Sequence, residues 1–552
     1  MNWTWADYEP HYNALKSTEV TSENAEAWLK DWTKLSDLLG EVGNRLYVAT
    51  SVNTADEVSE KQLQTYLRDI AENSNAEEEL LRQKLIASGV SVSGMENAMR
   101  QIKSDSDLFC AENLPLSTEL ADYSMEYDKL CGSRSVEWDG KEITLPEADM
   151  VLEENDRSRR EAAWKAKHNR ILADRQPLNE LWTKMFAVRE KIAANKGMAN
   201  FEQYMWQALH RFDYTPDDCA SFRQAILDHV VPAAKEVYEI RKRRLNLDTI
   251  KPWDLDVDIY ADEPLRPFAS EAELLEKSKK IFDDLDPELG EYFQDMIDNK
   301  LIDLYARKNK ANGGYCTSFP TAKKPFVFMN AVGSHDNLQT LIHEAGHCFH
   351  VYETADLPYK QQGEVGSEFA EVASMGMEML SHAYFHHFYN EKEAARAQIA
   401  HLERQLLFWP YMAVVDGFQH WAYTSGQGSD PVACDAKWAE LWDQFMAGID
   451  YTGLEDIKAT GWHRKLHIYQ VPFYYVEYGL AQVGALQVWL NAKKDEKAAV
   501  AAYRSALSLG CTKPLPDLFK TAGGKFAFDG ATIKELVDTM VAKVRELEKV
   551  IG

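Results

Sequence analysis

The stretch DNLQTLIHEAGHCFHVYE, residues 336–353, is predicted to form one helix, which Ser334 or Asp336 can cap at its amino end. The residues that give this helix an apolar side are Leu338, Leu341, Ile342 and Ala345. His343 and His347 lie at positions i and i+4, one turn apart on one face, so both imidazoles can reach a single cation. The helix is therefore a candidate metal-binding element.

The HExxH pattern in this helix points to zinc rather than to another metal. Two imidazole nitrogens and a carboxylate bind Zn2+, a water completes the tetrahedron, and the metal lowers the pKa of that water from about 15.7 to about 7. Glu344 follows the first histidine, so its carboxylate can contact such a water without binding the metal. His350 does not share the spacing of the pair, and we expect it to be a packed or surface residue.

A catalytic zinc needs a third protein ligand, which should come from a separate element. The segment GSEFAEVASMGMEMLSH, residues 366–382, has a helical pattern and carries Glu368, Glu371 and Glu378. The chain between His347 and Glu371 is long enough for a turn and a second helix packed against the first. Glu378 lies two turns beyond Glu371 on the same face, where it is either a hydrogen-bond partner that orients a ligand histidine or an ordinary helix-face carboxylate.

The rest of the chain is predicted to be mostly helical, with a few short strands. Amphipathic patterns run from Ser22 to about Ser104 and from Glu147 to beyond Ala199. The segment SVEWDGKEITL, residues 135–145, alternates around an Asp-Gly pair and predicts a small β-hairpin. The segment KPFVFMNAV, residues 324–332, is the clear strand signal of the second half, either a core strand or an exposed edge onto which an extended peptide adds.

The length of the chain predicts two lobes. Its 552 residues exceed the roughly 250–300 residues that one hydrophobic core usually serves. We expect an N-terminal helical lobe over residues 1–200, which includes the hairpin. A catalytic helical lobe with the HExxH site is expected over residues 201–552.

Charge and composition exclude several classes of partner. The formal net charge of -27 would repel nucleic acids and anionic membranes, and no concentrated Lys/Arg stripe offsets it. The start, MNWTWADYEP, lacks the pattern of a signal peptide, and no apolar run reaches the roughly 20 residues that span a bilayer. The seven cysteines are scattered without a CxxC pair, which favours free thiols in a reducing cytoplasm. We expect a cytoplasmic protein with neither nucleic-acid nor membrane partners.

Three separated motifs together resemble a known family. They are HEAGH, the following FAEVASMGMEM, and LHIYQVPFYYVEYGLAQVGALQVW at residues 466–489; NGGYCTSF and then a strand precede them in the same order. This arrangement resembles the thimet oligopeptidase and oligoendopeptidase F family of zinc metallopeptidases, closest to its Pz-peptidase-like bacterial branch. The matching motifs cover roughly residues 311–490. One departure is Ala373, where some members have proline.

The resemblance implies a function for individual residues. One zinc per chain would bind His343, His347 and Glu371, with Glu344 as general base and proton shuttle. The residues expected to bind substrate and stabilise the oxyanion are His467, Tyr475 and Tyr478, with Tyr474 as a competitor for the place of Tyr475. The implied fold is mostly α, with two helical lobes that enclose a deep channel and a zincin-like HExxH core. Such a channel would admit short peptides and exclude folded proteins.

The predicted function is a zinc-dependent oligoendopeptidase that hydrolyses internal bonds of short peptides. A zinc carboxypeptidase or dipeptidyl carboxypeptidase is an alternative that would share the same helix but needs a group to anchor the C-terminal carboxylate of the substrate. The non-enzymatic alternative is a helical peptide-binding scaffold with a structural or incidental metal. The sequence does not predict an oligomeric state.

Overall fold

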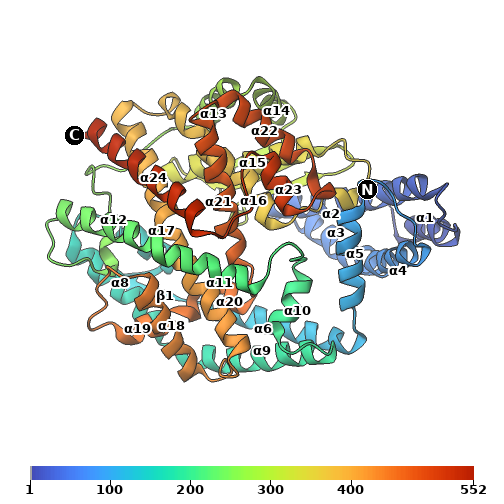
Figure 1. Ribbon diagram of the computed structural model, residues 1–552, viewed down its shortest axis with the longest axis horizontal. Coiled ribbons are helices and arrows are strands. Elements are labelled where there is room, and N and C mark those ends of the chain that lie inside the picture. The colour runs from blue at the N-terminus through green and yellow to red at the C-terminus, as the bar shows by residue number, and fades with distance from the viewer. Residues whose placement is uncertain (1–2) are drawn as a thin grey trace. The chain divides into compact units, whose positions relative to one another are not determined.

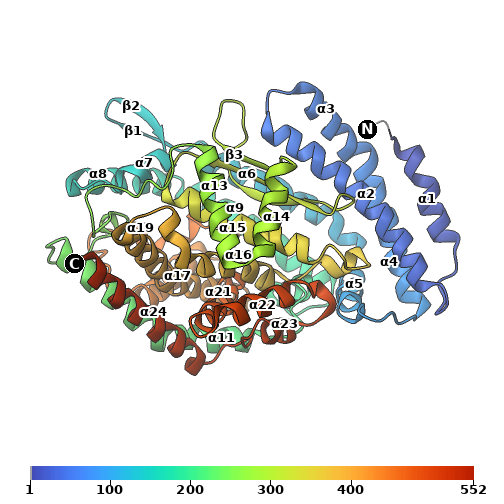
Figure 2. The same ribbon diagram turned by 90° about the horizontal axis from the view of Figure 1, so that it is seen from above.

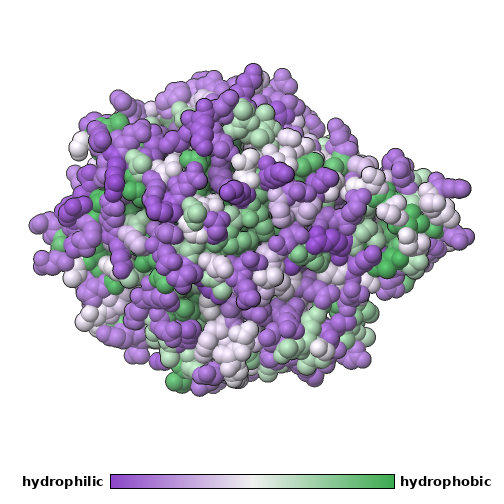
Figure 3. Space-filling model, viewed as in Figure 1, coloured by the Kyte–Doolittle hydropathy of each residue, from purple (hydrophilic) through white to green (hydrophobic). Residues whose placement is uncertain are grey.

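Figure 1 shows the computed structural model, which describes residues 3–552. Helices account for most of these residues and the strands are short, which confirms the predicted fold class. On the face shown in Figure 3, hydrophilic residues predominate and apolar residues lie in small groups. Within residues 3–552, none of the helices combines the length and the apolar character that a membrane span requires.

The chain forms two compact units, and each unit is assembled from three segments. Unit 1 comprises Met1–Asp107, Leu265–Ala394 and Leu480–Phe526. Unit 2 comprises Leu108–Pro264, Ala395–Gly479 and Ala527–Gly552. The lobes proposed from the sequence were continuous stretches, whereas each unit combines residues from both of those stretches. Periodicity in a sequence identifies helices but not the distant helices whose apolar faces cover them.

Unit 1 contains the helix that carries the HExxH pattern. Its first four helices lie side by side (Figures 1 and 2) around a core that includes Tyr12, Trp28 and Trp32. The amphipathic helices predicted between Ser22 and Ser104 are thereby confirmed. The helices of this unit are α1 (Trp5–Ser17), α2 (Ala25–Val52), α3 (Glu57–Tyr66), α4 (Glu72–Ser88), α5 (Glu96–Leu108), α13 (Glu271–Leu285), α14 (Pro287–Asp298), α15 (His335–Glu353), α16 (Ser367–Ser381), α22 (Glu496–Leu507) and α23 (Leu515–Thr521).

A three-stranded sheet of unit 1 lies against α15. Its order is β3 (Ile302–Tyr305), β5 (Lys324–Ala331) and β4 (Tyr315–Phe319), with β5 parallel to β3 and antiparallel to β4. The prediction of a strand at residues 324–332 is confirmed, but the alternative that it forms an exposed edge is wrong. Strand β5 has a partner on both sides and is buried along most of its length, as its nearly continuous apolar run requires.

Unit 2 contains the predicted β-hairpin. Strands β1 (Ser135–Trp138) and β2 (Lys141–Thr144) pair antiparallel, and Asp139 and Gly140 both have positive φ, as a two-residue turn of type I′ requires. The helices of this unit are α6 (Leu114–Gly132), α7 (Leu145–Val151), α8 (Arg157–Leu172), α9 (Arg175–Asn195), α10 (Phe201–Ala208), α11 (Pro216–Ala225), α12 (Val231–Arg244), α18 (Pro431–Phe445), α19 (Glu455–Ala459), α20 (Leu466–Tyr469) and α24 (Gly530–Ile551). Two further helices, α17 (Glu391–Thr424) and α21 (Tyr475–Ala492), contribute residues to both units.

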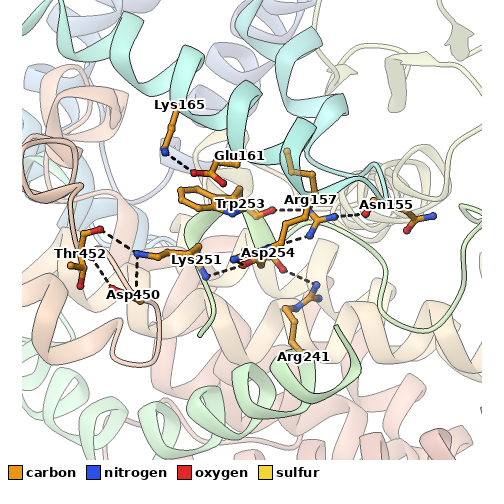
Figure 4. A network of polar contacts seen from close by, with 11 residues as sticks. Asn155, Arg157, Glu161, Lys165, Arg241, Lys251, Trp253, Asp254, Asp450 and Thr452 are labelled. Carbon is orange, nitrogen blue, oxygen red and sulfur yellow. Dashed lines mark hydrogen bonds and ion pairs between the residues drawn. The ribbon is translucent and has the colours of Figure 1, made fainter. Parts of the chain in front are cut away.

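A buried ion network in unit 2 fixes the start of the proline-containing segment at residues 251–268 (Figure 4). Asp254 is fully buried, and both its oxygens accept hydrogen bonds from Arg157, at 2.9 and 2.8 Å. Arg160 donates to the same carboxylate at 3.1 Å, and the backbone N–H of Lys251 donates at 3.0 Å. Burial alone would raise the pKa of Asp254, but these donors lower it below its ordinary value. The segment is thus held to α8 by a carboxylate whose charge is fully compensated.

Candidate metal centre and histidine-tyrosine cluster

Helix α15 begins where the sequence predicts. Ser334 is its N-cap, and the side-chain oxygen of Ser334 accepts a hydrogen bond from the backbone N–H of Asn337 at 3.3 Å. The predicted apolar side is buried, comprising Leu338, Leu341, Ile342 and Ala345. Because this side packs inside unit 1, the face that carries His343 and His347 is held in a fixed direction.

Gly346 brings helix α16 close to the two histidines. A Cβ atom at this position would lie 2.4 Å from the carbonyl oxygen of Ala373 and 2.7 Å from the Cα atom of Ser374. Only glycine therefore permits α15 and α16 to approach this closely. The carbonyl of Ala373 also accepts a hydrogen bond from the hydroxyl of Tyr503 at 2.6 Å, which ties α16 to α22.

The side chains of His343, His347 and Glu371 converge. The distance from Oε2 of Glu371 is 3.6 Å to Nε2 of His343 and 3.8 Å to Nε2 of His347. Donor atoms around a tetrahedral zinc, with bonds of about 2.0–2.2 Å, lie roughly 3.3–3.6 Å apart. Two imidazole nitrogens and one carboxylate oxygen are also the donor types that zinc prefers in hydrolytic sites. The group therefore fits a zinc ion with little adjustment.

Two neighbouring side chains of α16 orient these groups. Oε1 of Glu378 lies 2.6 Å from Nδ1 of His343, so the other ring nitrogen, Nε2, faces Glu371. This contact confirms Glu378 as the partner of a candidate ligand. The hydroxyl of Ser374 donates to Oε2 of Glu371 at 2.8 Å. Sequence reasoning did not identify Ser374, although its position three residues after Glu371 on a helix was a usable signal.

The electrostatics of this group show a shortage of positive charge. Burial raises the pKa of Glu371 and of Glu344, and the charge of Glu378 raises both further. Burial alone would lower the pKa of His343, but its hydrogen bond to Glu378 and the surrounding carboxylates raise it to about 9. Burial and the charge of His343 lower the pKa of His347 to about 3. A divalent cation among these side chains would supply the missing charge.

Glu344 and His350 occupy different surroundings on α15. Glu344 is buried and interacts electrostatically with His343 and Glu371, so it belongs to the same charged group. His350 is also buried and packs against the ring of Phe369, as expected for a packed residue outside the ligand set. Burial lowers the pKa of His350 to about 4, so its imidazole is neutral.

A cavity of about 420 Å³ adjoins His347 within unit 1. Its walls come from β4, from α15 and from the segment before α16. Its lining includes Cys316, Thr317, Ser318, His347, His350 and Glu364. Sequence reasoning did not predict this cavity, because its walls are brought together only by the packing of the sheet against α15.

The predicted histidine and tyrosines form a second cluster, in unit 2. The ring of His467 lies 4.7 Å from that of Tyr475 and 6.1 Å from that of Tyr478, measured between centroids. Tyr474 also belongs to the cluster, with its ring 5.3 Å from that of Tyr478. Burial and then the charge of Lys465 lower the pKa of His467 to about 4, so this imidazole is neutral and can donate a hydrogen bond.

The three tyrosines of this cluster differ in accessibility. Tyr475 is only 7% exposed and packs against Phe408 and Tyr411, and burial raises the pKa of its hydroxyl. Tyr474 and Tyr478 are half-buried. Tyr474 and Tyr478 are therefore more accessible to a ligand than Tyr475.

Comparison with known proteins identifies relatives. The sequence model of Peptidase family M3 matches residues 150–538. Oligopeptidase PepF of Bacillus subtilis (strain 168) is 27% identical over 298 residues, which cover 53% of this chain and 43% of that relative. An oligoendopeptidase F homolog of Mycoplasma pneumoniae is 25% identical over 405 residues, which cover 68% of this chain and 63% of the relative. The chain therefore spans less than two thirds of the length of these curated relatives.

A solved structure extends the likeness to almost the whole chain. The structure of Pz peptidase A with inhibitor 2 superposes with a TM-score of 0.87 at 26% sequence identity. The superposition covers 98% of this chain and 96% of that one. The fold described above is thus shared from end to end with a peptidase structure.

Proposed function

Because the chain belongs to Peptidase family M3, we propose that it is a zinc-dependent oligoendopeptidase that hydrolyses internal bonds of short peptides. The observation that carries this proposal is the convergence of His343, His347 and Glu371, backed by Glu378 and accompanied by the buried carboxylate of Glu344. In this proposal one zinc ion per chain binds the three converging side chains.

Zinc, when bound, supplies a Lewis acid for the scissile carbonyl and a water of lowered pKa. Glu344 then accepts the proton of the attacking water and passes it to the leaving nitrogen. Burial raises the pKa of Glu344, which makes its carboxylate a stronger base for the first transfer. Glu378 holds the ring of His343, and Ser374 holds the carboxylate of Glu371.

The proposal gives the unit 2 cluster the task of binding substrate and stabilising the oxyanion. A neutral donor aimed at the developing negative charge is worth roughly 3–4 kcal/mol in such reactions. His467 and Tyr478 supply such donors, and the burial of Tyr475 favours Tyr474 for the remaining place. These roles rest on the family resemblance and on the accessibility of each side chain.

The substrate backbone is proposed to lie along β4 instead of β5. Strand β4 is an outer strand of the sheet, so one side of its backbone has no strand partner among residues 3–552. Asn44 donates to the carbonyl of Ser318 at 2.8 Å, so the proposed pairing is confined to the Tyr315–Thr317 part of the strand. The cavity beside Thr317 and His347 would then receive one substrate side chain.

This cavity does not supply the cation that a carboxypeptidase needs, although Lys465 adjoins the ring of Tyr475 in the unit 2 cluster. A carboxypeptidase needs a cation to hold the C-terminal carboxylate of its substrate. The described residues that line the cavity include Glu364 but neither arginine nor lysine. A terminal carboxylate placed here would meet a negative charge, whereas an uncharged stretch of peptide would not.

The test compares wild type with Glu344→Gln on a panel of quenched peptides, each with a free and an amidated C-terminus. We expect wild type to cleave both forms at internal bonds, and Glu344→Gln to retain zinc and lose at least roughly 100-fold in kcat. Glu368→Gln serves as the control, because Glu368 is a buried glutamate of α16 outside the ligand group. Strict loss of cleavage on amidation would identify a carboxypeptidase instead. Absence of turnover in zinc-loaded wild type would support the scaffold alternative.

A further inference from the structure

Two cysteines meet beside the candidate metal ligands. Cys316 lies on β4 and Cys348 on α15, and their Sγ atoms are 3.4 Å apart. Both are free thiols, and both belong to unit 1. Hydrolysis as proposed above uses neither thiol, so the contact has no assigned role.

The position of this pair connects it to the candidate site in two ways. Cys348 directly follows His347 in the chain, so a shift of its backbone moves a candidate ligand. Cys316 is half-buried and lines the cavity next to His347, whereas Cys348 is fully buried. A small molecule that enters this cavity therefore reaches the sulfur of Cys316 first.

We propose that Cys316 and Cys348 form a reversible disulfide under peroxide stress and that this disulfide lowers peptide hydrolysis. The thiol of Cys316 is oxidised by a peroxide to a sulfenic acid, with release of one water from hydrogen peroxide. Cys348, whose sulfur lies 3.4 Å away, then attacks that sulfur as its proton passes to the departing hydroxyl, so the S–S bond forms and a second water leaves. Two thiols and one hydrogen peroxide thus give one disulfide and two waters. A dithiol reductant reverses the reaction.

The disulfide changes the geometry of the site because the sulfur atoms must approach further. An S–S bond is about 2.05 Å long, so the present separation shortens by roughly 1.4 Å. Rotation of the two side chains, together with movement of β4 and α15, takes up this shift, and these two elements carry the proposed peptide-pairing edge and His347. A displacement of about 1 Å in a reacting site costs on the order of 100-fold in rate. The proposed disulfide rests on the contact between the two sulfur atoms, whereas the loss of hydrolysis rests in addition on the proposed function.

The experiment treats reduced, zinc-loaded protein with a small excess of hydrogen peroxide and follows three quantities. Peptide mapping by mass spectrometry should find residues 316 and 348 linked, and the number of free thiols should fall from seven to five. Peptide turnover should fall on the order of 10- to 100-fold and return after dithiothreitol. Cys316→Ser should form no link, and peroxide should not change the turnover of this variant, whatever its turnover is before treatment relative to wild type.

The matched control is Cys131→Ser, which removes a half-buried thiol of unit 2 and should respond to peroxide as wild type does. Sulfinic acid at Cys316 without a linked peptide would overturn the proposal, as would a linked peptide with unchanged turnover. Zinc content is measured on each sample, and inactivation by loss of zinc without a link would also overturn it. If the reduced protein cleaves no peptide, the proposed function fails, but the mapping still decides whether the disulfide forms.

Discussion

Asp254 in unit 2 and Glu371 in unit 1 are both poorly accessible carboxylates, yet their surroundings shift their pKa values in opposite directions. Arg157, Arg160 and a backbone N–H surround Asp254, and its pKa falls despite burial. Glu371 has burial and Glu378 to raise its pKa, with only His343 and Ser374 opposing them. The first carboxylate is neutralised by the protein itself, whereas the second belongs to a group in which three carboxylates, Glu344, Glu371 and Glu378, face one charged imidazole, that of His343.

This difference separates a structural ion network from a metal site when both contain the same residue types. Cys219, Asp416 and His420 in unit 2 also bring potential ligand atoms close together. However, Arg223 pairs with Asp416, and Nδ1 of His420 contacts Glu202. Burial would raise the pKa of Asp416, but His420 and Arg223 lower it well below its ordinary value. This group resembles the Asp254 network, so we expect it to bind no zinc.

The largest expected effect comes from Glu371→Ala. Wild type should hold one zinc per chain, and this variant should lose both the zinc and at least roughly 99% of turnover, because two imidazoles alone leave the metal site incomplete. Zinc content by elemental analysis and turnover on one quenched peptide measure the two losses. Asp254→Asn is the control and should keep its zinc.

A Glu371→Ala protein that still holds one zinc with normal affinity would disprove the assignment of the third ligand. The Cys219 group is the alternative source of such a zinc. Adding Cys219→Ala to the same protein would then remove the metal. The Cys219 group would in that case be a metal site and not a structural ion network.

The helices and the metal-ligating pattern were predictable because both depend on local spacing. The i, i+4 placement of His343 and His347 required only helical geometry, and the Asp139-Gly140 turn required only residues that tolerate positive φ. The partners of β5 were not predictable, because the short apolar run was compatible both with a core strand and with an exposed edge. The same limit applies to the Cys316–Cys348 contact, since it depends on how α15 packs against β4, whereas the Ser374–Glu371 contact is local to α16 and its spacing was visible in the sequence.

Asp254→Asn should have the next largest effect, on stability instead of on metal binding. Arg160 is only 3% exposed at its side chain, so the variant leaves a buried guanidinium without its carboxylate and should lower the free energy of unfolding by about 3 kcal/mol. The pKa of Asp254 is lower in the folded protein than in the unfolded chain. Its contribution to the free energy of unfolding is therefore complete above about pH 3.9 and is lost as the pH falls through the lowered pKa. Urea unfolding at several pH values measures both effects. Wild type and variant should differ most near neutral pH and converge in acid, and a constant difference would contradict the lowered pKa.

Glu378→Gln should have the smallest effect of the three variants. It tests whether the negative charge of Glu378 strengthens zinc binding by His343, His347 and Glu371. An amide can still contact Nδ1 of His343, at 2.6 Å from Oε1 of Glu378 in wild type, but it removes one negative charge from the site. Zinc affinity should fall about 10- to 100-fold, which is typical for the loss of a carboxylate behind a ligand histidine. Competition with a chelator measures the affinity, and excess zinc should restore most of the turnover. Unchanged affinity would mean that the charge of Glu378 contributes little to zinc binding. The negative charges that attract the metal would then be those of Glu344 and Glu371.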